Sequence, residues 1–244
     1  MFLNKLIAVG LGWQDLFPAV GKVKRGEFSA QELAEIDAIR QEWAANGTAN
    51  YPRPYGPEVV WALRGGVKRD FSWSNNGAQK MRAMMARGEA FPSWGSNNDV
   101  SMSVEAVRAG AKVIYGSGWQ IAASANVVGM LPDMSLYMPD DGPKRVKAIN
   151  LGLHAQAQMQ RIKGQGNIDW MVPIIMDLEA GYGHFLNAYL VTMLAIEAGA
   201  AAVHIEDQGV LKKCGHLGGK VVVPVGEQIN RLIAARLAAD VAGV

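Results

Sequence analysis

Apolar residues recur at helical spacing along much of the chain. Leu33, Ile36 and Ile39 fall on one side of a helix predicted over residues 30–45, and a capping box precedes it. The same spacing predicts further helices over residues 58–64, 77–87, 104–109, 143–162, 186–198 and 227–241. The helices before residue 90 are expected to form an N-terminal helical layer.

Short apolar runs between the later helices predict strands, over residues 91–94, 112–115, 171–176 and 202–205. The run 171–176 is apolar at nearly every position, as in a parallel strand buried on both faces, although Pro173 cannot donate to the strand ladder. Strands that alternate with helices predict an α/β fold with a parallel sheet. We therefore expect an N-terminal helical segment over residues 1–89 and an α/β domain over residues 90–244.

Composition narrows the function classes. The chain has 244 residues, of which 50% are hydrophobic and 19% charged, as in ordinary globular proteins. Its net charge of +2 is too small to suggest a nucleic-acid partner, and no apolar run approaches the roughly 20 residues that cross a bilayer. A single cysteine excludes an internal disulfide framework and fits a reducing compartment, so we expect a cytoplasmic protein.

That cysteine, Cys214, is the first candidate for chemistry. It lies in the run Lys212-Lys213-Cys214-Gly215-His216, and three glycines are nearby. Two ammonium groups and an imidazole favour the thiolate, which is a usable base or nucleophile. The alternative is a buried structural cysteine, which the polar, glycine-rich surroundings disfavour.

Acidic residues follow three of the predicted strands. Asp133 lies in the loop after the second strand, Asp177 and Glu179 follow the third, and Glu206 follows the fourth. Side chains two apart on an extended segment point the same way, so Asp177 and Glu179 are expected to face one site. Several carboxylates at one mouth would repel one another unless a cation joined them, and such oxygen ligands suit Mg²⁺. Taken singly, each acidic residue could instead be a solvated surface group.

The segment after the second strand can hold a small anion. Tyr115 ends that strand, and Ser117-Gly118-Trp119 follows. Glycine lets the backbone approach a ligand closely, and the serine hydroxyl and backbone N–H groups can donate to a carboxylate. An ordinary tight turn is the alternative interpretation.

Five motifs occur in the order in which isocitrate lyases have them. They are Ser117-Gly118-Trp119-Gln120, Pro132-Asp133 with Ser135-Leu136-Tyr137, Asp177-Leu178-Glu179-Ala180-Gly181-Tyr182-Gly183, Glu206-Asp207-Gln208, and the run 212–220. From about Glu35 to its last residue the chain resembles the isocitrate lyase family. Methylisocitrate lyases, which are close relatives, usually have Arg where this chain has Lys213.

The resemblance implies a role for each candidate. Cys214 would be the acid that protonates a carbanion from a mobile loop, with its acidity tuned by Lys212, Lys213 and His216. The glyoxylate part of the substrate would be held by Ser117, Gly118 and Trp119, with help from Gly215 and His216. Asp177 would be the main Mg²⁺ ligand, while Asp133, Glu179 and Glu206 would act largely through water. Tyr115 is a weaker candidate for the base, and Leu178 could crowd the two carboxylates beside it.

The implied reaction is the Mg²⁺-dependent retro-aldol cleavage of isocitrate to glyoxylate and succinate, in the glyoxylate cycle. The alternatives are a methylisocitrate lyase or related carbon–carbon lyase, and a non-catalytic truncated homologue, since the Arg, Glu and Asn/Ser-rich segment that the family draws from its second half have no counterpart here.

The implied fold is a (β/α)₈ TIM barrel, of which the four strand–helix units would be about the first half. An open half-barrel exposes strand edges and apolar faces, so we expect a homo-oligomer.

Overall fold

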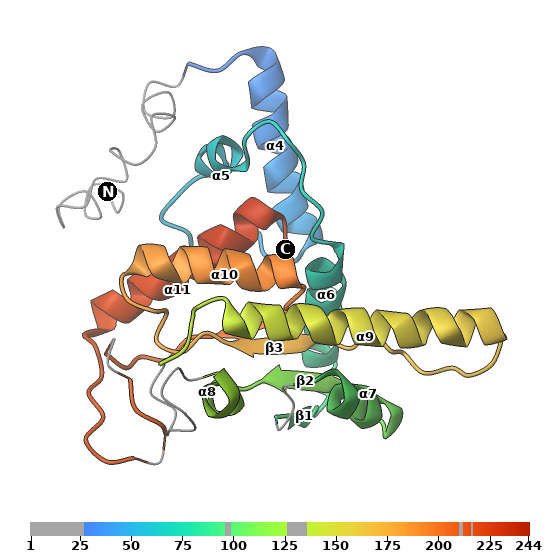
Figure 1. The fold of residues 1–244 in the computed structure, drawn as a ribbon. Helices are drawn as coiled ribbons and strands as arrows, with labels where there is room; N and C mark the ends of the chain where they lie inside the picture. The colour runs from blue at the N-terminus through green and yellow to red at the C-terminus, as the bar shows by residue number, and fades with distance from the viewer. Residues whose placement is uncertain (1–26, 96–98, 126–135, 210–211, 216) are drawn as a thin grey trace. The chain divides into compact units, whose positions relative to one another are not determined.

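A computed structural model describes residues 27–95, 99–125, 136–209, 212–215 and 217–244 (Figure 1). They form two compact units. One contains the described residues up to Asp70 together with Asp240–Val244, and the other contains Phe71–Ala239. The domain boundary predicted from the sequence, between residues 89 and 90, stays a prediction.

Two helices form the body of the smaller unit, α4 (Ala30–Ala45) and α5 (Pro57–Arg64). The predicted capping box is present at the start of α4. A buried ion pair ties the segment between the helices to the end of the chain. Arg53 Nε lies 2.6 Å from Asp240 Oδ2, and the Tyr55 hydroxyl donates to the same oxygen at 2.8 Å. The Asp240 carboxylate therefore has charged and neutral donors, as burial requires.

A four-stranded parallel sheet forms the centre of the larger unit, in the order β1-β2-β3-β4. The strands are β1 (Ser93–Trp94), β2 (Val113–Gly116), β3 (Ile174–Asp177) and β4 (Ala202–His204). The helices are α6 (Ser72–Ala86), α7 (Val100–Arg108), α8 (Gly118–Ala125), α9 (Asp141–Lys163), α10 (Phe185–Ala198) and α11 (Val225–Ala242). The predicted α/β fold with a parallel sheet is confirmed.

Several boundaries differ from the prediction for local reasons. β3 starts at Ile174, after Pro173, because proline has no N–H, although its carbonyl still accepts from Ile114 N at 3.0 Å. α7 starts four residues early because the Asp99 side chain caps it, accepting from Met102 N at 2.8 Å. The segment 118–125, expected as a loop, is the helix α8.

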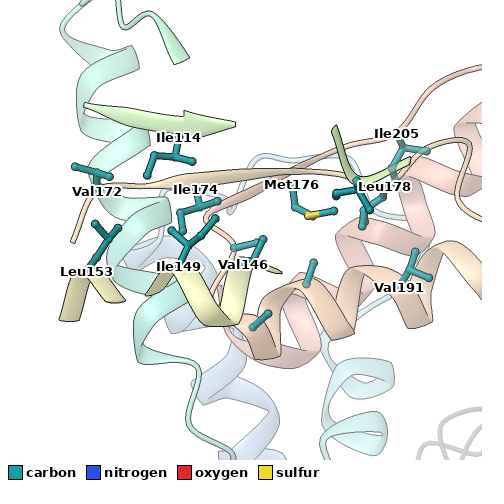
Figure 2. Packing of buried hydrophobic residues seen from close by; sticks show 14 of the residues in the cluster. Ile114, Val146, Ile149, Leu153, Val172, Ile174, Met176, Leu178, Val191 and Ile205 are labelled. Carbon is teal, nitrogen blue, oxygen red and sulfur yellow. The ribbon is translucent and has the colours of Figure 1, made fainter. Parts of the chain in front are cut away.

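The core lies between the sheet and α9. Figure 2 shows Val146, Ile149 and Leu153 of α9 on the side of that helix that faces Ile174 and Met176 of β3. All five side chains are buried. Helix α9 also contacts α7 and α10, so it packs against helices from two other parts of the unit.

Apolar side chains remain exposed on several helices and on one edge strand of this unit. Trp94 of β1 is 52% exposed, and Ile162, Leu190 and Leu232 are exposed on α9, α10 and α11. Within the described residues, no helix is both long enough and apolar enough to cross a bilayer.

Candidate active site

Asp177 lies at the point where three strands of the sheet end. Its Oδ2 atom accepts hydrogen bonds from the Tyr115 hydroxyl at 2.9 Å and from Gly118 N at 3.2 Å, and its Oδ1 atom accepts from Glu179 N at 2.8 Å. Tyr115 comes from β2 and Gly118 opens α8. The aspartate is buried, so these donors replace the water that a carboxylate needs.

Glu179 lies beside Asp177 in a backbone conformation that the sequence did not predict. Its φ is +54°, in the left-handed region, so the extended geometry assumed from the spacing is wrong. The carboxylate is fully buried and accepts a hydrogen bond from the Tyr137 hydroxyl. Glu206 N donates to Glu179 O at 2.7 Å, which brings the segment after β4 alongside. A non-glycine residue in this region costs about 1–3 kcal/mol, and such residues gather at functional sites.

Leu178 does not crowd the two carboxylates. Its side chain is fully buried in the apolar core, where Figure 2 shows it near Ile205. Its backbone N–H donates to His204 O at 2.8 Å, as a continuation of the pairing between β3 and β4. The expected conflict between an apolar side chain and the acidic site is therefore absent at this position.

A lysine from the cysteine loop is held by two of the carboxylates. The Lys212 ammonium is paired with Glu179 Oε2 and lies 3.0 Å from Glu206 Oε1. Lys212 is 1% exposed and Glu206 is 20% exposed at the side chain. A buried carboxylate requires a positive partner, and Lys212 supplies positive charge to Glu179 and Glu206.

Gln208 anchors the loop that carries Cys214. Its side-chain amide bonds the backbone of Lys213 at two points, Nε2 to the carbonyl at 3.0 Å and Oε1 to the N–H at 3.1 Å. Its backbone pairs with Val222 in an antiparallel bridge that joins the two ends of the loop, so Gln208 both closes the loop and fixes Lys213 inside it. Cys214 lies directly after the anchored residue and is buried.

Four residues in this region received no role from the sequence. Gln208 and Tyr137 were only part of the motifs. His204 ends β4, and its Nδ1 lies 3.1 Å from the Tyr115 hydroxyl. Arg231 is fully buried on α11 and donates to Gln208 O at 2.7 Å. The helical spacing of residues 227–241 placed Arg231 opposite the apolar positions Ile229 and Leu232, so no sequence signal indicated its burial.

The proposed substrate-binding residues are only partly brought together. Ser117 is buried next to Gly118, whereas Trp119 is about half exposed on α8. Gly215 lies in the anchored loop beside Cys214. Two of the candidates, Asp133 and His216, lie outside the described residues.

The carboxylates suit a hard cation chemically. A Cβ atom placed on Gly118 would lie 3.0 Å from Asp177 Oδ2 and closer still to Glu179 Oε1, so these two oxygens converge on one point. Oxygen donors of this kind suit Mg²⁺. As they are arranged here, no three acidic, histidine or cysteine side chains among the described residues meet closely enough to hold a metal ion.

Burial and the acidic neighbours keep the tyrosines of the site protonated. The pKa of Tyr115 is raised by burial and then by Asp177, and the pKa of Tyr137 is raised by burial and then by Glu179. A Tyr115 phenol that holds its proton cannot supply a phenolate base in the folded chain at neutral pH.

We therefore expect Tyr115 to contribute no phenolate absorbance to the folded protein at a pH slightly above 10. The wild type and Tyr115→Phe should titrate alike while folded, and the wild type should show one additional phenolate group after unfolding in urea. Because the folded chain holds this proton more tightly, its stability should fall as pH rises above about 10, the ordinary tyrosine pKa. A difference between the two folded proteins near pH 10 would contradict the expectation.

Comparison with known proteins decides the family. The sequence model that describes the isocitrate lyase family matches residues 35–244 of this chain. The chain belongs to the isocitrate lyase family. The isocitrate lyase of Halalkalibacterium halodurans is 44% identical over 194 residues, which are 79% of this chain and 45% of that protein. That of Salmonella typhimurium is 42% identical over 220 residues, which are 86% of this chain and 50% of that protein. The chain thus spans about half the length of these curated relatives.

The fold has solved counterparts. A structure of oxaloacetate acetylhydrolase in complex with the inhibitor 3,3-difluorooxalacetate is 26% identical, with a TM-score of 0.54. The match covers 68% of this chain and 50% of that chain. The likeness supports the α/β arrangement with a parallel sheet, in which ligands bind at the carboxyl ends of the strands.

Proposed function

We propose that the chain contributes the active site of an isocitrate lyase, which cleaves isocitrate to glyoxylate and succinate in the glyoxylate cycle. Asp177 accepts from Glu179 N, Lys212 joins Glu179 to Glu206, and this acidic site beside the loop that holds Cys214 carries the proposal. A carboxylate cluster and a thiol supply two of the parts that a retro-aldol cleavage of a hydroxy acid needs, one to hold a cation and one to donate a proton.

Cys214 is the proposed acid. When the carbon–carbon bond of isocitrate breaks, its electron pair stays on the carbon that becomes part of succinate. The Cys214 thiol transfers its proton to that carbon and becomes a thiolate, which later regains a proton. Lys213 is fixed by Gln208 directly before Cys214, so the position of the thiol depends on this anchor. Lys212, Lys213 and His216 are proposed to tune the thiol and to hold substrate carboxylates.

The hydroxyl proton of the substrate must go to a base. Tyr115 donates to Asp177 and also lies near His204 Nδ1. Because its pKa is raised by burial and by Asp177, Tyr115 would act as a base only by passing its own proton on as it takes the substrate proton. With Asp177 assigned to the cation, His204 is the group placed to receive that proton.

The proposed cofactor is Mg²⁺, with Asp177 as its main ligand and Glu179, Glu206 and Asp133 acting through water. When bound, it would polarise the hydroxy-acid end of the substrate and stabilise negative charge there. Ser117, Gly118, Trp119, Gly215 and His216 are proposed to hold the glyoxylate part. Gly118 N already donates to Asp177, so α8 and the acidic site are held together.

Beyond the site, we propose that the four strand–helix units are about half of a (β/α)₈ barrel. Exposed apolar side chains on α9, α10 and α11 support self-association into a homo-oligomer, which sedimentation would test. A single cysteine and a loop thiol that must stay reduced support a cytoplasmic location.

Two alternative functions differ from isocitrate lyase activity, one in its substrate and the other in having no turnover. A methylisocitrate lyase or related carbon–carbon lyase is disfavoured by Lys213, where those enzymes usually have Arg. A non-catalytic homologue would bind a cation without turnover.

Release of glyoxylate from isocitrate, with and without Mg²⁺, tests the proposed function on the purified chain. We expect Mg²⁺-dependent release that Asp177→Asn abolishes. Asp169→Asn is the matched control, because Asp169 lies before β3 at the other end of the strand, is exposed, and pairs with Lys80. A folded chain that releases no glyoxylate would overturn the proposed activity. Faster cleavage of methylisocitrate than of isocitrate would favour the related lyase.

A further inference from the structure

A cleft of about 500 Å³ lies at the end of the sheet opposite the acidic site. Its walls come from the second half of α6, from the turn between α7 and β2, and from the segment before β3. Lys112 directly precedes β2 and Pro173 directly precedes β3, so the cleft is at the amino ends of these strands. Each strand has 4 residues, which span about 13 Å at about 3.3 Å per residue, so a ligand in the cleft would not touch the acidic site.

The base of the cleft is apolar. Met84 belongs to one apolar cluster of this unit, with Met81 and Val113, whereas Val107 and Val172 belong to the main cluster. The three side chains that line the cleft are buried, so the cleft lies between these two clusters. Its volume is within the range of about 300–1,000 Å³ that is usual for small-molecule sites. The base can therefore accept an apolar group.

The rim of the cleft carries more positive than negative side chains. Its charged residues are Lys80, Arg87, Glu89, Arg108, Lys112 and Asp169. Glu89 is shared by two cations, because Arg87 Nη2 lies 2.8 Å from Glu89 Oε2 and Lys112 is paired with Glu89 Oε1. Both cationic side chains are 61% exposed, so a ligand can reach them. One carboxylate cannot neutralise two full charges, and a second carboxylate can therefore bind here.

Each of the other two cations of the rim has a carboxylate of its own. Lys80 Nζ lies 2.6 Å from Asp169 Oδ2, and Arg108 is paired with Glu105, which lies outside the cleft. Among the described residues, the rim thus keeps one positive charge in surplus, on the side of Arg87. A monoanion fits that surplus, whereas a cation would be repelled.

We propose that this cleft is a binding site for a small organic monocarboxylate. Its carboxylate would contact Arg87 and Lys112, where the surplus charge lies. Its apolar body would pack against Met84, Val107 and Val172 at the base. The inference goes beyond the proposed lyase activity and does not depend on it, because the cleft shares no residue with the acidic site.

Binding of benzoate to the purified chain, without Mg²⁺, tests the inference. Benzoate is a monoanion at neutral pH and has an apolar ring. NMR saturation transfer from the protein to the ring protons should detect the contact, and a titration gives the affinity. Acetate has the charge without the ring, and benzyl alcohol has the ring without the charge. Each should bind at least about fivefold more weakly than benzoate, because each loses one of the two contributions.

Two substitutions in one ion pair should change the affinity in opposite directions. Arg87→Gln removes the surplus positive charge and should weaken benzoate binding by about two- to fivefold. Glu89→Gln increases the surplus and should strengthen binding by a similar factor. Arg40→Gln is the matched control, since Arg40 is 57% exposed on α4 and is also paired with a nearby carboxylate, that of Asp37. This variant should bind benzoate like the wild type.

The outcomes separate a binding site from a structural role of the charges. Damage to the local structure would weaken binding in both cleft variants, so only a direct electrostatic contact predicts opposite signs. Shifts in the same direction, equal affinities in the wild type and both variants, or no measurable benzoate binding would overturn the inference. Acetate or benzyl alcohol binding as tightly as benzoate would overturn it as well. Failure to release glyoxylate, with the benzoate results as expected, would overturn the lyase activity alone.

Discussion

Replacing Cys214 with serine is expected to lower the rate of Mg²⁺-dependent glyoxylate release by about 10²–10⁴-fold, the usual contribution of a positioned acid. The hydroxyl matches the thiol in shape but is a far weaker acid, so it cannot deliver a proton to the carbanion as the bond breaks. Substrate binding should be nearly unchanged, because this group acts only in proton transfer. The loss should therefore appear in kcat and leave KM close to the wild-type value.

The control must separate the thiol from the loop. Val221→Ala changes the same loop at a side chain that is 73% exposed, while its carbonyl still accepts from Gly209 N at 2.9 Å. This variant should keep most of the activity. Thermal unfolding should show that Cys214→Ser is folded, since a buried hydroxyl needs a hydrogen-bond partner. Turnover by Cys214→Ser within a few-fold of the wild type would remove Cys214 from the proposed mechanism.

The parallel sheet could be predicted from the sequence because its strongest signal is local. Residues 171–176 are apolar at nearly every position, and the structure places β3 between β2 and β4, at the centre of the four strands. Helix α8 could not be predicted in this way. Glycine disfavours helices, and what favours this one is a distant contact, because Gly118 N donates to the Asp177 carboxylate.

The candidate site could be predicted as a set of residues but not as an arrangement. Strand ends indicated that Asp177, Glu179 and Glu206 would be near one another, because parallel strands share one carboxyl edge. The left-handed backbone at Glu179 and the burial of Lys212 depend on contacts between segments far apart in sequence. The contacts of Tyr137 with Glu179 and of Gln208 with Lys213 could not be predicted either, because residue spacing alone does not identify these partners.

Replacing Gly118 with alanine is expected to disable the acidic site. Gly118 is the first residue of α8 and its φ is not positive, so the backbone itself would accept alanine. The added Cβ atom, however, would lie 3.0 Å from Asp177 Oδ2 and deep inside contact distance of Glu179 Oε1. Glu179 has little room to retreat, because Tyr137 and Lys212 hold its carboxylate.

Two losses should follow from this one methyl group. Forcing an atom into a packed site should cost about 1–3 kcal/mol of folding free energy. A carboxylate displaced by about 1 Å should lower the rate of glyoxylate release by about 10²-fold. The affinity for Mg²⁺, measured by calorimetry, should fall as well, because Asp177 and Glu179 could no longer converge on one point.

Gly226→Ala is the matched control, since it makes the same chemical change in the first turn of α11, where a Cβ atom would meet nothing within 4 Å. There, alanine should be neutral or should stabilise the chain by about 0.4–1 kcal/mol, because it restricts the unfolded chain. The two variants together distinguish a crowded site from a general effect of losing a helical glycine. Wild-type Mg²⁺ affinity and turnover in Gly118→Ala would mean that the two carboxylates do not act as a pair, and the assignment of Asp177 and Glu179 to one cation would fail.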